Sequence, residues 1–275
     1  MTQPAFPFAA TTYALTDAGF AGHRIAGRWV GSIGGGAMDV ENPRHGAVMG
    51  RVAMGEAVDV DAAVAAAKAA FPAWRDTPPK ARALILHRWR VLLESHLDEL
   101  AMLASHENGK IVGEARASVE KGIECLEFAI AVPNSDTGGV LEVSRGIRCE
   151  VRHEPLGVVA GVVPFNFPAM VPMWMAPLAL IAGNAFICKP SEKVPYTFAR
   201  MVELAEQAGL PPGVLQLVQG GRPVVERLCD HPDVRALAFV GSTKVARLVY
   251  GRTTAAGKRC LALGGAKNHL IVVPD

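Results

Sequence analysis

The chain has 275 residues, half of them hydrophobic, and a formal net charge of +2. This length and composition predict a globular protein with one large domain or two smaller ones. Without a dense run of Lys or Arg, the charge argues against nucleic acid and anionic membrane surfaces as partners. The cysteines are scattered and form no CxxC pair, which favours reduced thiols in a cytoplasmic protein over disulfides or a zinc site. They are Cys125, Cys149, Cys188, Cys229 and Cys260.

Two segments bear on targeting and membrane insertion. The N-terminal stretch MTQPAFPFAATTYALTDAGF has no basic region followed by an apolar core, so we expect no secretory signal. Residues 169–188 are long and apolar enough to suggest a membrane span. Pro172, Pro177 and the Gly183–Asn184 pair interrupt them, which favours a buried helix.

In the first half of the chain, short strands are predicted over 23–31 and 48–54, joined through the turn-rich segment ENPRHG. An amphipathic helix follows over 59–74, because apolar residues recur there at helical spacing. Further helices are predicted over 81–110, with an end near Asn108–Gly109, and from about 113 to 131. Residues 141–151 alternate polar and apolar side chains and predict an exposed hairpin.

From Gly157 onward, strands and helices alternate. GVVAGVV is a continuous apolar run, typical of a strand covered on both faces. Similar strands are predicted in NAFICKP, VLQLVQG and ALAFVGS, with helices in YTFARMVELAEQAG, PVVERLC and TKVARLVYGRTTAAG. This rhythm predicts an α/β fold with a doubly wound parallel sheet.

Two segments at strand ends suit a nucleotide. In CKPSE, Lys189 and Glu192 are three residues apart and could bind the two hydroxyls of a ribose. The alternative is a helix start with Ser191 as its cap. In FVGSTKVA, Gly241 and a helix N-terminus suit a pyrophosphate, and an ordinary N-cap is the alternative. No GxGxxG fingerprint is present.

Two further side chains are candidates for catalysis. Asn166 stands in the apolar segment PFNFP, where a buried amide without a partner costs free energy, so it either caps a turn or is held for a ligand. Cys260 follows Lys258 and Arg259, which would depress its pKa, although a lone Cys at the start of an apolar strand is often inert core. No His pair such as HxxxH occurs, and no metal is expected.

Together these segments resemble the aldehyde dehydrogenase superfamily, and within it the CoA-acylating malonate- and methylmalonate-semialdehyde dehydrogenases. The Phe at the second position of PFNFP, and AKNH in place of the usual GK motif, are similar to that branch. The matching segments are NPRHGAVMGRVAMGEAVDVDAAVAAAKAAFPAW, HENGK, EKGIE, PFNFP, ICKPSEKVP, LPPGVLQLVQG, FVGST and GGAKNH.

The resemblance implies a Rossmann-like cofactor domain with a protruding β-hairpin. Residues 1–139 would be the N-terminal part of the NAD-binding domain, 140–156 an oligomerisation hairpin, 157–270 the Rossmann-like core, and 271–275 the start of a catalytic domain. It also implies that Asn166 donates to the thiohemiacetal oxyanion. The other implied roles are nicotinamide contacts for the Val163 backbone, Phe165 and Gly264, ribose contacts for Lys189 and Glu192 with Lys193 beside them, and a pyrophosphate contact for Ser242.

Three departures from the family pattern bear on function. Four residues before Lys267, where the superfamily has a Glu base, stands Leu263, with Ala262 beside it. Without that carboxylate the thioester is expected to await an external thiol, which supports CoA as acceptor. Lys121 replaces an Arg implicated in binding the substrate carboxylate, and it lacks the bidentate fork. The family nucleophile lies after the GGAKNH segment, so this chain is expected to be the cofactor-binding half.

The leading hypothesis is NAD-dependent, CoA-acylating oxidation of malonate or methylmalonate semialdehyde by a cytoplasmic homodimer or homotetramer. The carboxylate of Glu192 would repel a 2′-phosphate and so favours NAD over NADP. The alternatives are a non-catalytic nucleotide- or partner-binding module and a CoA-independent aldehyde dehydrogenase.

Overall fold

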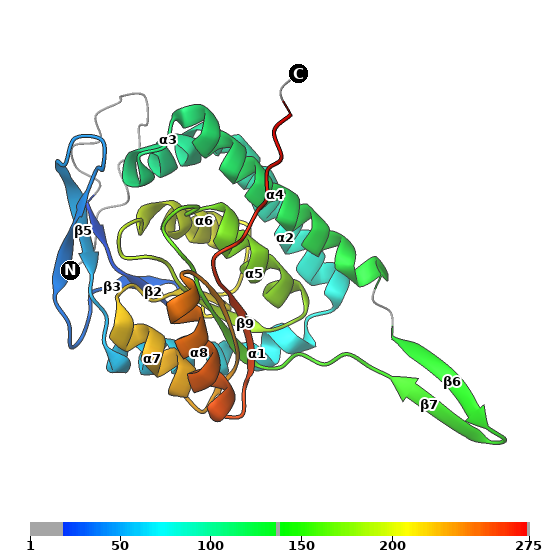
Figure 1. Cartoon of the computed structure of the whole chain (residues 1–275). Coiled ribbons are helices and arrows are strands. Elements are labelled where there is room, and N and C mark those ends of the chain that lie inside the picture. Colours follow the sequence, from blue (N-terminus) through cyan, green and yellow to red (C-terminus); the bar gives the residue numbers. More distant parts are fainter. Residues whose placement is uncertain (1–18, 136–137, 274–275) are drawn as a thin grey trace.

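The computed structural model describes residues 19–135 and 138–273, so most of the segment in which no secretory signal was expected lies outside it. Its centre is a seven-stranded sheet of order β12-β11-β8-β9-β10-β2-β3 (Figure 1). The first five of these strands are parallel, and β2 and β3 add antiparallel. The strands are β2 (His23–Ile25), β3 (Arg28–Val30), β8 (Val158–Val162), β9 (Ala185–Lys189), β10 (Leu215–Leu217), β11 (Val234–Val240) and β12 (Arg259–Leu263).

Helices cover both faces of this sheet, which confirms the doubly wound α/β prediction. The helices are α1 (Ala57–Asp76), α2 (Pro79–Ser95), α3 (Leu97–Asn108), α4 (Val112–Ser135), α5 (Met170–Ile181), α6 (Tyr196–Gln207), α7 (Arg222–Asp230) and α8 (Thr243–Ala255). Alternate residues of the central strands serve different layers. Val159 and Phe186 pack with α2, α4, α5 and α6, whereas Val158 and Ile187 pack with α1, α7 and α8. This alternation explains why β8 is apolar at every position.

The N-terminal region contains more strands than predicted. Residues 23–31 are two strands, because Ala26 and Gly27 both have positive φ (50° and 74°) and turn the chain back on itself. The prediction also missed a three-stranded sheet of order β1-β5-β4. It comprises β1 (Phe20–Ala21), β5 (Val48–Ala53) and β4 (Ala37–Glu41).

The single helix predicted over 81–110 is two helices, which meet at His96. That residue has φ −108° and ψ 17°, and its Nδ1 lies 2.8 Å from the carbonyl oxygen of Leu92. No Gly or Pro marks the break, so the sequence pattern could not reveal it. The end of the second helix was predicted correctly, since Gly109 adopts the left-handed conformation just after Asn108.

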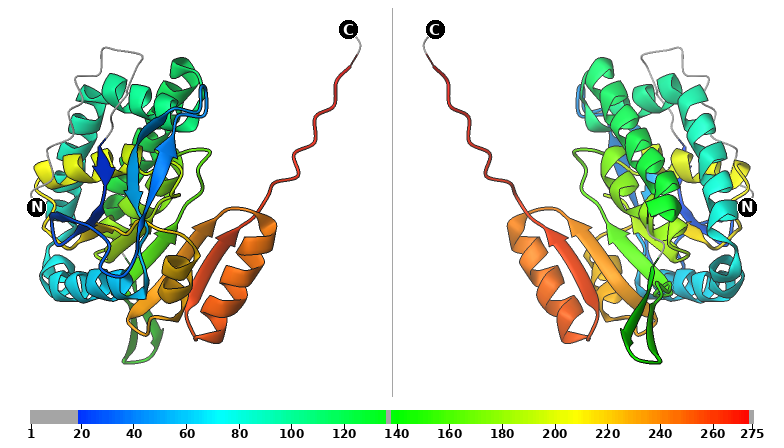
Figure 2. Two further views of the ribbon diagram at one scale, coloured as in Figure 1. Left: turned by 90° about the vertical axis from the view of Figure 1, so that its left-hand side faces the viewer. Right: turned by 90° about the vertical axis from the view of Figure 1, so that its right-hand side faces the viewer.

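A hairpin of β6 (Gly139–Ser144) and β7 (Ile147–Val151) projects from the body of the molecule (Figure 1). Every residue of the two strands is exposed, as the alternating pattern predicted. Residues 264–273 also leave the body, as an extended segment after β12 (Figure 2). Within the described residues, no helix combines the length and hydrophobicity that crossing a membrane requires.

Candidate functional site

A cleft of about 740 Å³ opens at the carboxyl ends of β8, β9 and β11. After β8, the chain continues to β9 and β10 on one side and to β11 and β12 on the other. The cleft therefore lies at the switch point of the sheet, where open α/β sheets bind ligands. Its lining residues from the strands and the segments that follow them are Val162, Val163, Pro164, Phe165, Lys189, Ser191, Glu192, Phe239, Val240, Gly241 and Ser242.

Lys189 and Glu192 form an ion pair inside this cleft, with Nζ 3.1 Å from Oε2. The Lys189 side chain is 6% exposed and that of Glu192 is 29% exposed, so the pair is reached only from the cleft side. Burial favours a higher pKa for Glu192, but the Lys189 ammonium and hydrogen bonds to the carboxylate outweigh it and leave the pKa below its usual value. Glu192 is thus held as a charged acceptor.

The alternative interpretation of this segment, a helix capped by Ser191, is wrong. The next helix, α6, begins only at Tyr196. The Ser191 hydroxyl instead accepts a hydrogen bond from the backbone N–H of Lys193 at 3.3 Å, within a turn.

The N-terminus of α8 faces the cleft without a side-chain cap. Ser242 occupies the N-cap position, but its side chain makes no capping hydrogen bond. The preceding residue, Gly241, lines the cleft, and a side chain is not tolerated there because a Cβ would lie 2.5 Å from the Phe239 ring. Uncapped N–H groups and the helix dipole favour an anion at this point.

The wall of the cleft between α7 and α8 carries both apolar and charged side chains. Val225, Leu248 and Val249 line it together with Arg222, Glu226 and Arg252. Its apolar part suits a flat, uncharged ring. The sequence interpretation did not identify these residues. In the sequence, these positions are recognisable only as apolar residues of helices that follow strands. Packing of the helices against the sheet explains such residues equally well.

The PFNFP loop differs from its prediction. Asn166 is exposed, so it does not carry the desolvation cost expected for a buried amide. Its side-chain amide has no hydrogen-bond partner among residues 19–135 and 138–273, so the turn-capping interpretation is wrong. Phe165 is 52% exposed and lines the cleft, as does Val163. Their contact with a nicotinamide stays a prediction.

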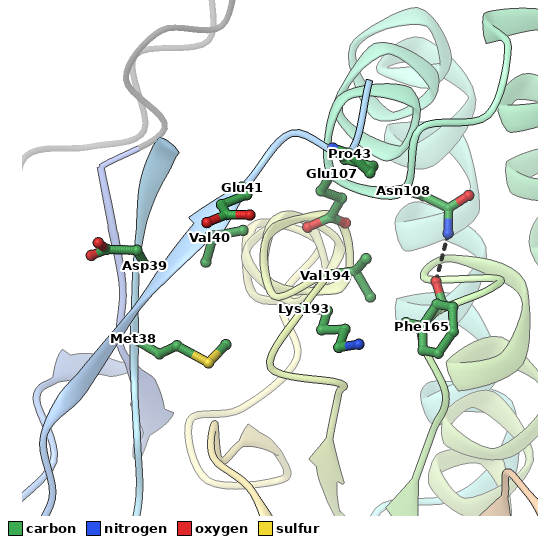
Figure 3. Close-up of a pocket in the computed structure, with 10 residues that line it drawn as sticks. All are labelled: Met38, Asp39, Val40, Glu41, Pro43, Glu107, Asn108, Phe165, Lys193 and Val194. Carbon is green, nitrogen blue, oxygen red and sulfur yellow. Dashed lines mark hydrogen bonds between the residues drawn. The ribbon is translucent and has the colours of Figure 1, made fainter. Parts of the chain in front are cut away.

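A second cavity of about 590 Å³ lies on the other side of Phe165, between β4 and the end of α3 (Figure 3). Lys193 lies in it with its Nζ 5.3 Å from the centre of the Phe165 ring. Lys193 therefore lines this second cavity and not the cleft of Lys189 and Glu192, although its charge also lowers the pKa of Glu192. Its neighbours here include Glu107 and Val194.

Comparison with known proteins identifies the family. A model of the aldehyde dehydrogenase family matches residues 29–275. The chain belongs to this family. Malonate-semialdehyde dehydrogenase 1 of Geobacillus kaustophilus is 50% identical over 252 residues, which are 91% of this chain and 52% of the relative. The chain thus spans about half the length of the curated relatives it matches.

Solved structures agree with this assignment. A structure described as a methylmalonate-semialdehyde dehydrogenase from Sinorhizobium meliloti, complexed with NAD, has a TM-score of 0.90 and 43% identity. It covers 93% of this chain and 52% of its own. The methylmalonate-semialdehyde dehydrogenase of Oceanimonas doudoroffii has a TM-score of 0.89 and 42% identity, over 91% of this chain and 51% of its own. The resemblance inferred from the motifs is confirmed.

Three residues that the family pattern implicated, Asn166, Lys121 and Gly264, line neither cavity. Lys121 is exposed on α4 and pairs with Glu124, with Nζ 2.8 Å from Oε2. Gly264 lies against the start of α8, where a Cβ would be 3.0 Å from the Thr243 hydroxyl. A substrate contact for Lys121 and a nicotinamide contact for Gly264 stay predictions.

The cysteine that resembles the family nucleophile is not activated. Lys258 donates to the carbonyls of Cys229 and His231 at the end of α7, so its ammonium binds these carbonyls and not the Cys260 thiol. Burial raises the pKa of Cys260, contrary to the expected depression by its basic neighbours. Its side chain packs in the layer of α7 and α8 and does not line the cleft. No group of three or more His, Cys, Asp or Glu residues suited to a metal occurs in the part of the chain that the structure describes.

Proposed function

We propose that these residues form the cofactor-binding half of an NAD-dependent, CoA-acylating dehydrogenase that converts malonate or methylmalonate semialdehyde to an acyl-CoA. The observation that carries the proposal is the cleft at the switch point. It brings a charged pair, Lys189 and Glu192, and an uncapped helix N-terminus at Ser242 into one cleft. The similarity to a methylmalonate-semialdehyde dehydrogenase solved with NAD supports the same assignment.

The groups lining the cleft fit NAD. Lys189 and Glu192 would bind the hydroxyls of a ribose, and the N-terminus of α8 would hold the pyrophosphate. A flat ring would lie on the apolar side chains between α7 and α8. Glu192 is held charged and would repel a 2′-phosphate, which favours NAD over NADP. Val163 and Phe165 then border the nicotinamide. NAD supplies a hydride acceptor for the aldehyde carbon.

We assign to Asn166 the stabilisation of the oxyanion that forms on the aldehyde oxygen. Attack of a thiolate on the aldehyde places negative charge on the former carbonyl oxygen, and the exposed Asn166 amide can donate to it. A fixed neutral donor commonly contributes about 3 kcal/mol to such a step. Loss of hydride from this adduct gives a thioester. Leu263 and Ala262 offer no carboxylate to activate water, so the CoA thiol accepts the acyl group and releases the enzyme thiol.

The exposed hairpin, the cellular compartment and Lys121 complete the proposal. The exposed hairpin β6–β7 carries apolar side chains such as Leu141 and Ile147 and suits contact with further copies of the chain, in a homodimer or homotetramer. We assign the protein to the cytoplasm, with no nucleic acid or membrane partner, and Lys121 to the substrate carboxylate.

The raised pKa and packed position of Cys260 favour a second candidate for these residues on their own, a nucleotide-binding module without turnover. We therefore expect no NADH from the purified 275 residues with any aldehyde. NADH formation that disappears in a Cys260→Ser variant would promote Cys260 to nucleophile.

The direct test uses the complete gene product, meaning the longest open reading frame that contains these residues. It is mixed with NAD and either semialdehyde, with and without CoA. NADH is followed by absorbance, and the product is identified by mass spectrometry. We expect an acyl-CoA and slow turnover without CoA. A free carboxylic acid formed equally fast without CoA would show a CoA-independent enzyme instead.

A further inference from the structure

The C-terminal end of α3 contacts the PFNFP loop at two consecutive carbonyls. Asn108 donates from Nδ2 to the carbonyl oxygen of Phe165 at 2.7 Å (Figure 3). Lys110 donates from Nζ to the carbonyl oxygen of Asn166 at 2.8 Å. These carbonyls belong to the two peptide groups that flank the Cα of Asn166. Because each peptide group is planar, holding both carbonyls restricts φ and ψ of Asn166 and so sets the direction in which its Cα–Cβ bond leaves the backbone.

A second contact holds the Lys110 ammonium in place. It lies 3.9 Å from the centre of the Phe167 ring, within the range of a cation–π interaction. The ammonium is thus fixed between the backbone of Asn166 and the ring of the next residue. The side chain is partly buried, which lowers its pKa, while Glu114 opposes that shift.

The segment that carries Asn108 and Lys110 is itself braced. Gly109 has φ 84°, so the chain reverses there and the side chains on either side of it reach the same loop. Arg44 donates from Nη2 to the Lys110 carbonyl at 2.6 Å, and the Ser105 hydroxyl donates to the same oxygen at 2.7 Å. A rigid support of this kind is what an oriented catalytic group requires.

We propose that Lys110 and Asn108 are positioning residues that orient the Asn166 amide for the oxyanion. The inference rests on the function proposed above, because it needs Asn166 to act on the reacting carbonyl. A residue that merely stabilised the loop would change the melting temperature and NAD affinity, since Phe165 borders the cleft. A residue that orients Asn166 changes chiefly the rate of acylation.

The test compares acylation in the complete gene product and its variants by pre-steady-state kinetics, with NAD affinity and melting temperature on the same samples. Lys110→Met should slow acylation about 10-fold, because a small misplacement of a catalytic group is costly. NAD affinity should stay within about 2-fold, since Lys110 does not line the cleft. Lys110→Arg should recover most of the rate, as a guanidinium can donate to the same carbonyl and stack on Phe167.

Two comparisons make the test specific. In an Asn166→Ala background, Lys110→Met should change the rate by less than about 2-fold, because residues acting through one group are not additive. Lys68→Met is the matched control, since Lys68 pairs with Asp233 on an exposed surface, with Nζ 3.1 Å from Oδ2. It should acylate at the parent rate. If Lys110→Met does not fold, Asn108→Asp, which has nearly the same shape but no donor, replaces it in the same cycle.

The two proposals fail differently. Parent-like acylation by Asn166→Ala would overturn the assignment of Asn166 and this inference with it. Slow acylation by Asn166→Ala with a parent rate in Lys110→Met would overturn only the inference. An equal loss from Lys110→Met in both backgrounds would also overturn it.

Discussion

The N-termini of α6 and α8 both follow a strand of the parallel sheet, yet they are treated in opposite ways. At α6, the carboxylate of Glu107 reaches in from α3 and accepts hydrogen bonds from the N–H groups of Tyr196 and Thr197, at 2.7 and 2.9 Å, and from the Thr197 hydroxyl. At α8, the hydroxyl of Ser242 caps nothing. One helix end is closed by the protein itself, and the other is left open to the cleft.

The carboxylates of Glu107 and Glu192 also differ, in their surroundings and in the direction of their pKa shifts. Glu107 is 2% exposed, and burial raises its pKa to about 7, against the opposing hydrogen bonds from Thr197 and Tyr196. Glu192 has the Lys189 ammonium beside it, and its pKa is lowered despite burial. A carboxylate with a cation and access to the cleft is available to a ligand, whereas one surrounded by backbone donors stabilises the fold. Four predictions follow from this contrast.

The largest effect is expected from Glu107→Ala. Three donors at the start of α6 lose their acceptor, and the free energy of unfolding should fall by about 3 kcal/mol. Urea denaturation measures the change. Glu120→Ala is a matched control, since its partner Arg116 is exposed, and it should change stability by less than about 0.5 kcal/mol. Equal stability of the two variants would show that Glu107 is not the cap of α6.

The pKa of Glu107 predicts a pH dependence. Because its folded value of about 7 lies above the unfolded value of 4.5, the folded protein holds an extra proton between these limits. This contribution is complete below pH 4.5 and is lost as the pH rises through about 7, a decrease of about 3 kcal/mol in the free energy of unfolding.

The measurement is the difference between parent and Glu107→Gln, by urea denaturation from pH 5 to 8. The difference removes the contributions of His23, His106 and His231, whose pKa values burial lowers and which act in the opposite direction. Parallel pH curves for the two proteins would contradict the prediction.

In the cleft, Glu192→Gln should weaken NAD binding about 5-fold, because one charged acceptor is lost. The ratio of the affinity for NAD to that for NADP should fall about 10-fold. Titration calorimetry with both dinucleotides tests this. Stability should change by less than about 1 kcal/mol, because the amide still accepts from Lys189. Unchanged, tight NAD binding would place the ribose elsewhere.

The smallest effect is expected from Ser242→Ala. Because the hydroxyl makes no capping bond, the melting temperature should not change, whereas NAD affinity should fall about 3-fold through one lost hydrogen bond. An ordinary N-cap would behave in the reverse way, with about 1 kcal/mol of stability lost and NAD binding retained. Calorimetry and thermal melting on the same pair distinguish the two.

Features that depend on neighbouring residues could be predicted from the amino-acid sequence. The apolar run of β8 predicted a strand covered on both faces, and the alternation after Gly157 predicted the parallel sheet. Once that sheet is assumed, Lys189, Glu192 and Ser242 fall at the ends of strands, so their meeting in one cleft follows from topology. Family motifs then identified the chemistry, which periodicity alone does not carry.

Contacts between residues far apart in the chain could not be predicted and are known from the folded structure. Glu107 caps α6 from 89 residues away, and Lys110 holds Asn166 from 56 residues away. The exposure of Asn166, and the use of Lys258 as a cap for α7, depend on the same kind of contact. Local patterns record the preferences of neighbouring residues, whereas a side chain brought in by the fold can supply a donor or acceptor to any backbone group it reaches. For that reason a short motif cannot reveal such contacts.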